Sequence, residues 1–164
     1  MSCNYNFAKW EKWENRNILS GINYPGIYCI AIAEYDISGK NFEWIPDITY
    51  IGMTNSKGGL KSRLKQFDNT IRWKEGHGGA CRVRRKYPIY RELVSKLFVS
   101  VFSFHCDVNQ INPQNLRIMG DVAKHEYDCI AAYVEIFGEQ PEFNDKDRSP
   151  KSDKNMKSHY SSET

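Results

Sequence analysis

Two short tyrosine-centred motifs and one arginine define the part of the chain that could carry out chemistry. The motifs are Gly26-Ile27-Tyr28 and Tyr50-Ile51-Gly52, and Arg63 follows on a segment with helical periodicity. An arginine carries a permanent positive charge and can bind a phosphate through two hydrogen bonds. Tyrosine is common in strands, so either tyrosine alone is explained by strand packing. The two motifs in this order, followed by an arginine, indicate a functional site instead.

A carboxylate on the apolar side of a helix is the second chemical signal. At about 100° per residue, one face of the segment 122–137 collects Val122, Cys129, Ile130, Tyr133, Ile136 and Phe137. Glu126 falls near the middle of this face, whereas Glu135 projects to the opposite side. A carboxylate there costs several kcal/mol unless it is paired, hydrogen-bonded or bound to a metal ion. The two interpretations are a buried ion pair with Arg63 or another arginine, and a metal ligand.

Hydrolysis of a phosphodiester is a reaction that these groups could support. It requires a deprotonated water, stabilisation of the charge on the phosphoryl oxygens, and neutralisation of the leaving 3′ oxygen. Mg²⁺ on a single carboxylate suits this task, because it keeps several waters and accepts substrate oxygens. Tyrosine is a poor base at its reference pKa of about 10. It becomes an adequate base only where a cation and an arginine favour the phenolate.

Length and composition indicate one soluble globular domain. The chain has 164 residues, of which 40% are hydrophobic and 26% charged, which is enough for a sizeable core. No apolar run reaches about 18 residues, and we expect no secretory signal. The five cysteines form no C-x-x-C pair, so we interpret them as reduced thiols and expect a cytoplasmic protein. They are Cys3, Cys29, Cys81, Cys106 and Cys129.

Positive charge is concentrated in the middle of the chain. Residues 57–91 contain eleven Lys or Arg residues and two acids, although the whole chain has a net charge of only +3. This asymmetry predicts a basic face for a polyanion, and the alternative is a solvated surface balanced by the acidic remainder. The predicted contacts to the DNA backbone are Lys57, Lys61, Arg82, Arg84, Arg85 and Lys86. We interpret His77, between glycines beside this run, as a solvated loop histidine rather than a phosphate contact.

The predicted elements form a small α/β (α+β) fold with a three-stranded antiparallel sheet flanked by helices. The two motif strands form an antiparallel hairpin, and the alternating segment 97–104 is the central third strand. We expect residues 5–19 to form a short helix or arm whose tryptophans pack on the domain, and residues 105–120 to be irregular with a turn at Asn112-Pro113. The predicted strands are 26–33, 48–52 and 97–104, and the predicted helices are 60–73, 88–94 and 122–137.

Over residues 25–144 the chain resembles the GIY-YIG nuclease family. The resemblance rests on the two tyrosine motifs, Arg63 and Glu126. It implies a metal-dependent DNA endonuclease with one Mg²⁺ or Mn²⁺ per active site, held by Glu126. It also implies that Tyr28 is the general base and that Tyr50 positions water or phosphate. Asn144 matches the asparagine that follows the family's metal-ligand helix and would hold the site or a phosphate.

One position departs from the family pattern. The family often has a histidine or tyrosine one turn after the arginine, where this chain has Phe67. Phenylalanine can neither donate nor accept a hydrogen bond, so the resemblance leaves the activation of water without that residue.

The chain is similar to the short type II restriction endonucleases of the family, because we expect no additional DNA-binding domain. The expected domains are an N-terminal arm over 1–24, a nuclease domain over 25–144 and a disordered tail over 145–164. This similarity implies double-stranded DNA as substrate, a possible homodimer and a possible methyltransferase in the same system. The alternatives are a structure-specific or mobile-element nuclease with the same site, and a non-catalytic nucleic-acid-binding module.

Overall fold

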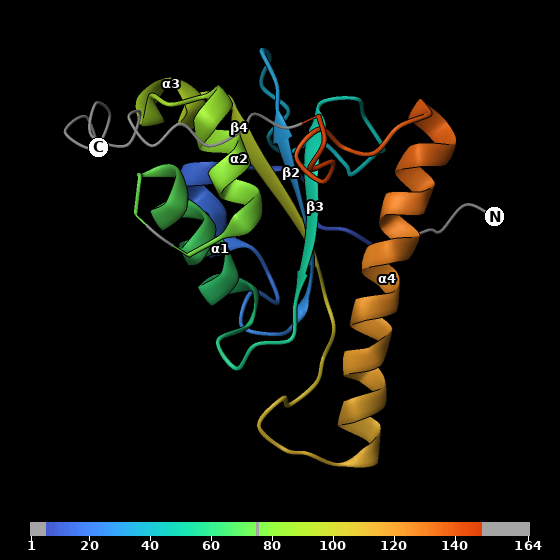
Figure 1. The fold of residues 1–164 in the computed structure, drawn as a ribbon. Helices are drawn as coiled ribbons and strands as arrows, with labels where there is room; N and C mark the ends of the chain where they lie inside the picture. The colour runs from blue at the N-terminus through green and yellow to red at the C-terminus, as the bar shows by residue number, and fades with distance from the viewer. Residues whose placement is uncertain (1–5, 75, 149–164) are drawn as a thin grey trace.

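Four antiparallel strands form a sheet at the centre of the structure, a computed structural model that describes residues 6–74 and 76–148 (Figure 1). The strand order is β1-β4-β2-β3. The strands are β1 (Glu11–Lys12), β2 (Gly26–Ile32), β3 (Ile48–Thr54) and β4 (Leu97–Ser103). The predicted mixed class and the antiparallel hairpin of β2 and β3 are confirmed. The predicted count of three strands is wrong, because β1, in a segment expected to be a helix or arm, pairs with β4.

Helices cover both faces of the sheet. The helices α1 (Gly59–Ile71), α2 (Gly78–Lys86) and α3 (Tyr90–Val94) lie on one side, and α4 (Pro113–Phe137) lies on the other (Figure 1). The core is therefore divided in two: Tyr28 and Ile30 pack with α1 and α2, whereas Ile27 and Cys29 pack with α4. Because both faces are covered, nearly the whole of β2 is buried, as its continuous apolar sequence predicts.

The first helix agrees closely with its prediction. Its apolar residues Leu60, Leu64, Phe67 and Ile71 are all fully buried and form the predicted stripe. Arg63 lies at the edge of this stripe and is half-buried. The helix therefore directs an arginine toward the boundary of the core rather than into free solvent.

The second helix was not predicted. Residues 76–79 were expected to be a glycine-rich loop, but α2 begins at Gly78, and His77 accepts a hydrogen bond from Ala80 N at 3.2 Å. The pattern was hidden because α2 has two glycines in its first turn and contributes only Ala80 and Val83 as buried apolar residues. Its position against α1 is set by tertiary packing rather than by local periodicity.

The last helix is longer than predicted. It begins at Pro113 instead of Val122, so the expectation of an irregular segment over 105–120 is wrong for its second half. The dipeptide Asn112-Pro113 is a helix start rather than a turn: the Asn112 side chain accepts from Asn115 N at 2.8 Å, and proline suits the first helical position. The helix ends at Phe137 before Gly138, which has a φ of 80°. Its buried residues are Val122, Cys129 and Tyr133, while Ile136, predicted on the same face, is exposed.

A buried carboxylate joins the N-terminal segment to α1 and α3. Asp68 accepts from Trp13 Nε1 at 2.8 Å, from Arg72 Nε at 2.8 Å and from Tyr90 Oη at 3.0 Å. Arg16 lies 3.4 Å away. Burial raises the pKa of Asp68, but these hydrogen bonds and the charge of Arg16 outweigh burial and hold the pKa below its usual value. The predicted packing of Trp10 and Trp13 on the domain is confirmed, because both are buried.

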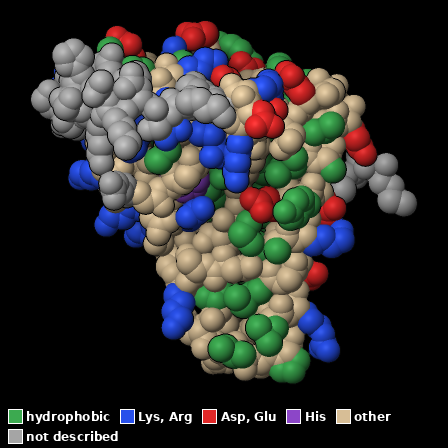
Figure 2. Space-filling model, viewed as in Figure 1, with side chains coloured by type: hydrophobic (Ala, Val, Ile, Leu, Met, Phe, Trp, Pro, Cys, Tyr) green, Lys and Arg blue, Asp and Glu red, His purple; other side chains and the backbone are tan. Residues whose placement is uncertain are grey.

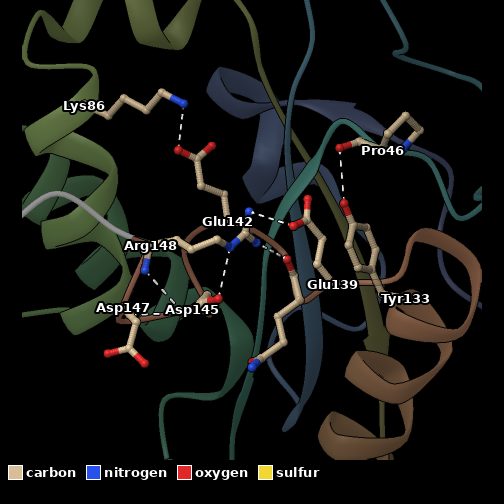
Figure 3. A network of polar contacts seen from close by, with 9 residues as sticks. Pro46, Lys86, Tyr133, Glu139, Glu142, Asp145, Asp147 and Arg148 are labelled. Atoms are coloured by element: carbon tan, nitrogen blue, oxygen red, sulfur yellow. Dashed lines mark hydrogen bonds and ion pairs between the residues drawn. The ribbon is translucent and has the colours of Figure 1, made fainter.

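The chain after α4 returns to the sheet and covers β3. Lys86 pairs with Glu142 at 2.6 Å, and Arg148 pairs with Glu139 at 3.3 Å and with Asp145 at 3.0 Å (Figure 3). The segment thus connects α2 to the end of α4 and keeps a defined conformation through Arg148. The rest of the predicted tail, residues 149–164, lies outside the described residues. No helix in the described ranges is long and apolar enough to cross a membrane.

We predict that Asp68→Ala lowers the free energy of unfolding by about 3 kcal/mol, because it leaves buried donors and Arg16 without their anion. Glu34→Ala is the control: Glu34 also pairs with a cation, Lys96, but is mostly exposed, and we expect a change below about 0.5 kcal/mol. Urea unfolding monitored by tryptophan fluorescence measures both. Equal losses in the two variants would contradict the anchoring role of Asp68.

Candidate active site

The two motif tyrosines lie side by side on the face of the sheet that α1 and α2 cover. Tyr28 on β2 is directly opposite Gly52 on β3, and its ring centroid is 6.0 Å from that of Tyr50. A Cβ atom at position 52 would lie 2.5 Å from Tyr28 Cζ and 2.9 Å from Tyr50 Cε1. The glycine of the second motif is therefore required because the Tyr28 ring occupies the space above it.

A second glycine, in α2, leaves room for the ring of Tyr50. A Cβ atom at Gly79, in the first turn of α2, would lie 2.5 Å from Tyr50 Cε2. The N-terminal end of α2 therefore contacts the Tyr50 ring directly. The glycines that hid α2 in the sequence allow it to approach the site this closely.

Arg63 is the positive charge at the centre of this cluster. Its Nη1 donates to Gln66 Oε1 at 3.0 Å, while its Nε is buried without a partner. Its charge lowers the pKa values of Tyr28 and Tyr50, although burial outweighs this effect and raises both, that of Tyr28 well above its usual value. Both hydroxyls are accordingly protonated at neutral pH. A buried donor with no acceptor is the polar group that an incoming anion would satisfy.

Glu126 reaches the cluster from α4, on the opposite side of β3. It is half-buried; burial raises its pKa and Arg63 lowers it, with burial the stronger effect. Its charge in turn raises the pKa of Tyr50. Within the described residues, no ion pair shorter than 4.0 Å involves Glu126. The ion pair with an arginine that the sequence left open is therefore not formed.

The edge position of β3 explains how both sets of side chains meet. β3 ends the strand order, so α4 and the layer of α1 and α2 flank it from its two sides (Figure 1). Side chains from α1 and α2 on one side of the sheet and from α4 on the other can therefore meet around the edge strand, without passing through the sheet. Residues separated widely in sequence thereby interact: the charges of Arg63 and Glu126 act on Tyr50, and the charge of Arg63 acts on Glu126.

His77 is part of the site, and its prediction as a solvated loop histidine is wrong. It is only 2% exposed, and its Nε2 lies 2.6 Å from Tyr28 Oη. Burial, together with the charges of Arg63 and Arg82, lowers its pKa to about 3. The Phe67 ring contacts the His77 ring edge-on, with centroids 5.1 Å apart. No sequence pattern pointed to this residue, since histidine is not a preferred helix cap.

Asn144 holds β3 in place. Its Oδ1 accepts from Ile51 N and its Nδ2 donates to Ile51 O, both at 2.8 Å. Ile51 is the middle residue of the second motif, so this pair of hydrogen bonds fixes the backbone between Tyr50 and Gly52 and extends the pairing along the edge strand. Both polar atoms of the side chain are used in this contact, which suits the predicted role of holding the site rather than a phosphate.

The predicted DNA contacts do not all reach the surface. Arg84 is buried: its Nη1 donates to Thr70 O and Lys74 O, and its guanidinium stacks on Trp73. It therefore joins α2 to the end of α1. Arg82 is half-buried and donates from Nε to Phe143 O at 2.8 Å, close enough to the site to affect the pKa of Tyr50. The remaining predicted contacts are exposed or half-buried, namely Lys57, Lys61, Arg85 and Lys86.

The side chains of the site fit a hard divalent cation that binds one carboxylate and water better than they fit a metal ion coordinated by protein ligands alone. No group of three or more His, Cys, Asp or Glu side chains placed to hold a metal occurs among the described residues. Among the residues that the structure describes, Glu126 is the acid whose charge acts on a motif tyrosine, and it forms no ion pair with them. A single carboxylate suits Mg²⁺ or Mn²⁺, which complete their coordination with water and substrate oxygens.

Comparison with known proteins gave no relative. No protein-family model matches the chain, and neither the curated proteins nor the solved structures include a significant match. The functional argument therefore rests on the residues and their geometry.

We predict that His77 makes the fold sensitive to mild acid. Its pKa is about 6.5 in an unfolded chain and about 3 in the folded protein. The contribution of His77 to the free energy of unfolding is fully present above its pKa in the unfolded chain. It falls as the pH drops below that pKa, because only the unfolded state binds the proton. Between pH 7 and pH 5 wild type should lose about 2 kcal/mol more than His77→Asn, which cannot titrate. Urea unfolding at both pH values measures this difference; parallel losses would show that His77 titrates normally.

Proposed function

We propose that the protein is a metal-dependent DNA endonuclease of the GIY-YIG type. The observation that carries the proposal is that Arg63 lies close enough to Tyr28, Tyr50 and Glu126, from both sides of β3, for its charge to lower the pKa of each of them. Two further features support it. Glu126 is a half-buried carboxylate outside every ion pair of the described residues, and Arg63 Nε is a buried donor without a partner. Both are costly for stability, which is typical of site residues.

Each residue has a distinct role in the proposed reaction. Glu126 would hold one Mg²⁺ or Mn²⁺, whose positive charge would stabilise the phosphoryl and leaving oxygens. Arg63 binds a phosphoryl oxygen through its guanidinium, and Tyr50 positions the attacking water. Tyr28 first releases its hydroxyl proton to solvent, and its phenolate then accepts a proton from the attacking water as the water oxygen bonds to phosphorus. The bond from phosphorus to the 3′ oxygen breaks, and the 3′ oxygen takes a proton from solvent. Because burial raises the pKa of Tyr28, its phenolate depends on nearby positive charge.

A basic surface beside the site supports DNA as the substrate. Lys and Arg side chains gather over α1 and α2 (Figure 2). We propose that the accessible members bind the DNA backbone and orient it toward β3. They are Lys57, Lys61, Arg82, Arg85 and Lys86. Arg84 is left out because its guanidinium is buried against backbone carbonyls.

At a finer level we propose a type II restriction-like enzyme that cleaves duplex DNA at a fixed sequence, as a homodimer or by successive nicks. A methyltransferase of the same system would protect the host sites. Incubation with long unmethylated DNA and Mg²⁺, with and without EDTA, tests this. Discrete bands that vanish with EDTA are the expected result. A smear, or preference for branched DNA, would replace sequence specificity with the structure-specific alternative, and salt-dependent binding without cleavage would favour the binding module.

We predict that Glu126→Gln reduces the cleavage rate at least about a thousandfold, because the amide cannot replace the metal-binding carboxylate. The same change should leave thermal stability equal or higher, because it removes a charge whose burial raises its pKa. Glu135→Gln is the matched control on the exposed side of α4, and its rate should equal that of wild type. Single-turnover cleavage and thermal unfolding measure the two effects. Undiminished cleavage by Glu126→Gln would remove Glu126 from the site.

We predict that Arg82→Gln weakens DNA binding through charge. In EDTA, the slope of log K against log salt concentration should become shallower by about one. Glutamine can still donate to Phe143 O, so the local packing is kept. Lys9→Gln is the control, since Lys9 lies beside Trp10 and Tyr35, away from α2. Filter binding or fluorescence anisotropy at several salt concentrations measures both slopes, and identical slopes for the two variants would exclude Arg82 from the DNA surface.

A further inference from the structure

The N-terminal cap of α2 determines which ring nitrogen of His77 carries the proton. His77 Nδ1 accepts a hydrogen bond from Ala80 N at 3.2 Å, so this nitrogen is unprotonated. A neutral imidazole has one N–H, which must then be on Nε2. The backbone N of His77 also donates to Thr70 Oγ1 at 2.9 Å, which fixes the position of the residue. The fold thus selects a single tautomer.

The tautomer sets the direction of the hydrogen bond to Tyr28. Because Nε2 carries the hydrogen, it donates to Tyr28 Oη across their separation of 2.6 Å. The hydroxyl hydrogen of Tyr28 must therefore point to an acceptor on the site side, and Tyr50 is the group there whose hydroxyl can accept it, whereas Arg63 can only donate to the Tyr28 oxygen. The arrangement orients Tyr28 so that its own hydrogen faces the reacting groups.

We propose that His77 is a positioning residue for the reaction: its Nε2–H hydrogen-bonds to the Tyr28 oxygen, orients the hydroxyl and stabilises the phenolate when it forms. This inference rests on the proposed nuclease function. It assigns the positioning of Tyr28 to the N-cap residue of α2. Phe67 on α1 lies beside the same rings, with its ring centroid 5.1 Å from that of His77 and 6.2 Å from that of Tyr50, but it has no polar atom for this task.

A neutral donor suits this position. His77 stays uncharged between pH 5 and pH 8, since its pKa is lowered to about 3. It therefore adds no positive charge beside Arg63 and Arg82, whose charges already disfavour its protonation. A hydrogen bond from a neutral group to a developing anion strengthens as the charge forms, which is how preorganised donors accelerate reactions.

Two amide variants separate the cap from the hydrogen bond to Tyr28. In His77→Asn, the side-chain oxygen can still accept from Ala80 N but reaches no further. In His77→Gln, the side-chain nitrogen can reach Tyr28 Oη, whereas the cap acceptor is lost. A structural role predicts that Asn is the better substitute, and the proposed role predicts that Gln is.

The test measures kcat, KM and thermal stability of both variants against wild type. We expect His77→Asn to lose about a hundredfold in kcat, with KM and stability close to wild type. His77→Gln should keep a higher kcat than His77→Asn despite lower stability. A kcat for His77→Asn equal to or above that of His77→Gln overturns the proposal.

A second readout does not depend on cleavage. Nitrogen-15 NMR of the histidine rings should show His77 as a neutral Nε2–H tautomer that does not titrate between pH 5 and pH 8, and its signal should shift in Tyr28→Phe. An Nδ1–H tautomer, or a ring that titrates in this range, overturns the inference. If wild type cleaves no DNA while these signals are as expected, the nuclease proposal fails and the His77–Tyr28 hydrogen bond stands.

Discussion

The ring of Tyr28, which belongs to β2, packs over Gly52 of β3, where β3 has no side chain. The rest of the site depends on this close approach. The pairing of Tyr28 with Gly52 requires the observed register of β2 and β3, since a shift by one residue would place the ring against Ile51 or Met53. Asn144 holds the same stretch of β3 through hydrogen bonds to the backbone N and O atoms of Ile51. The two motifs are therefore one packing unit, and the glycine is as necessary as the tyrosines.

The helices around this unit contribute ionisable side chains whose burial lowers the stability of the fold. Arg63 has a buried donor without a partner, Glu126 keeps a raised pKa, and His77 is held neutral far below its ordinary pKa. The buried carboxylate of Asp68 differs from that of Glu126: Asp68 receives three hydrogen bonds and an additional cation, and its pKa is lowered. The contrast between these two residues distinguishes a carboxylate that maintains the fold from one that is available to bind a cation.

Local periodicity in the sequence was sufficient for the elements that carry the motifs. The hairpin, the buried stripe of α1 and the position of Glu126 on the sheet-facing side of α4 follow from residue spacing alone. His77 and Arg84 could not be placed in this way, because their burial depends on how α2 packs against α1. The start of α4 was missed for a different reason: Asn-Pro fits both a turn and a helix N-terminus, and only the side-chain bond to Asn115 decides between them.

The most direct test of the account is the position of a bound metal ion. Crystals of the protein with duplex DNA and Mn²⁺, measured at the manganese absorption edge, would locate the ion by its anomalous scattering. The account predicts one ion per chain, coordinated by the Glu126 carboxylate and a phosphate oxygen, with the guanidinium of Arg63 on the same phosphate. An ion held elsewhere, or DNA bound with no ion at Glu126, would contradict it.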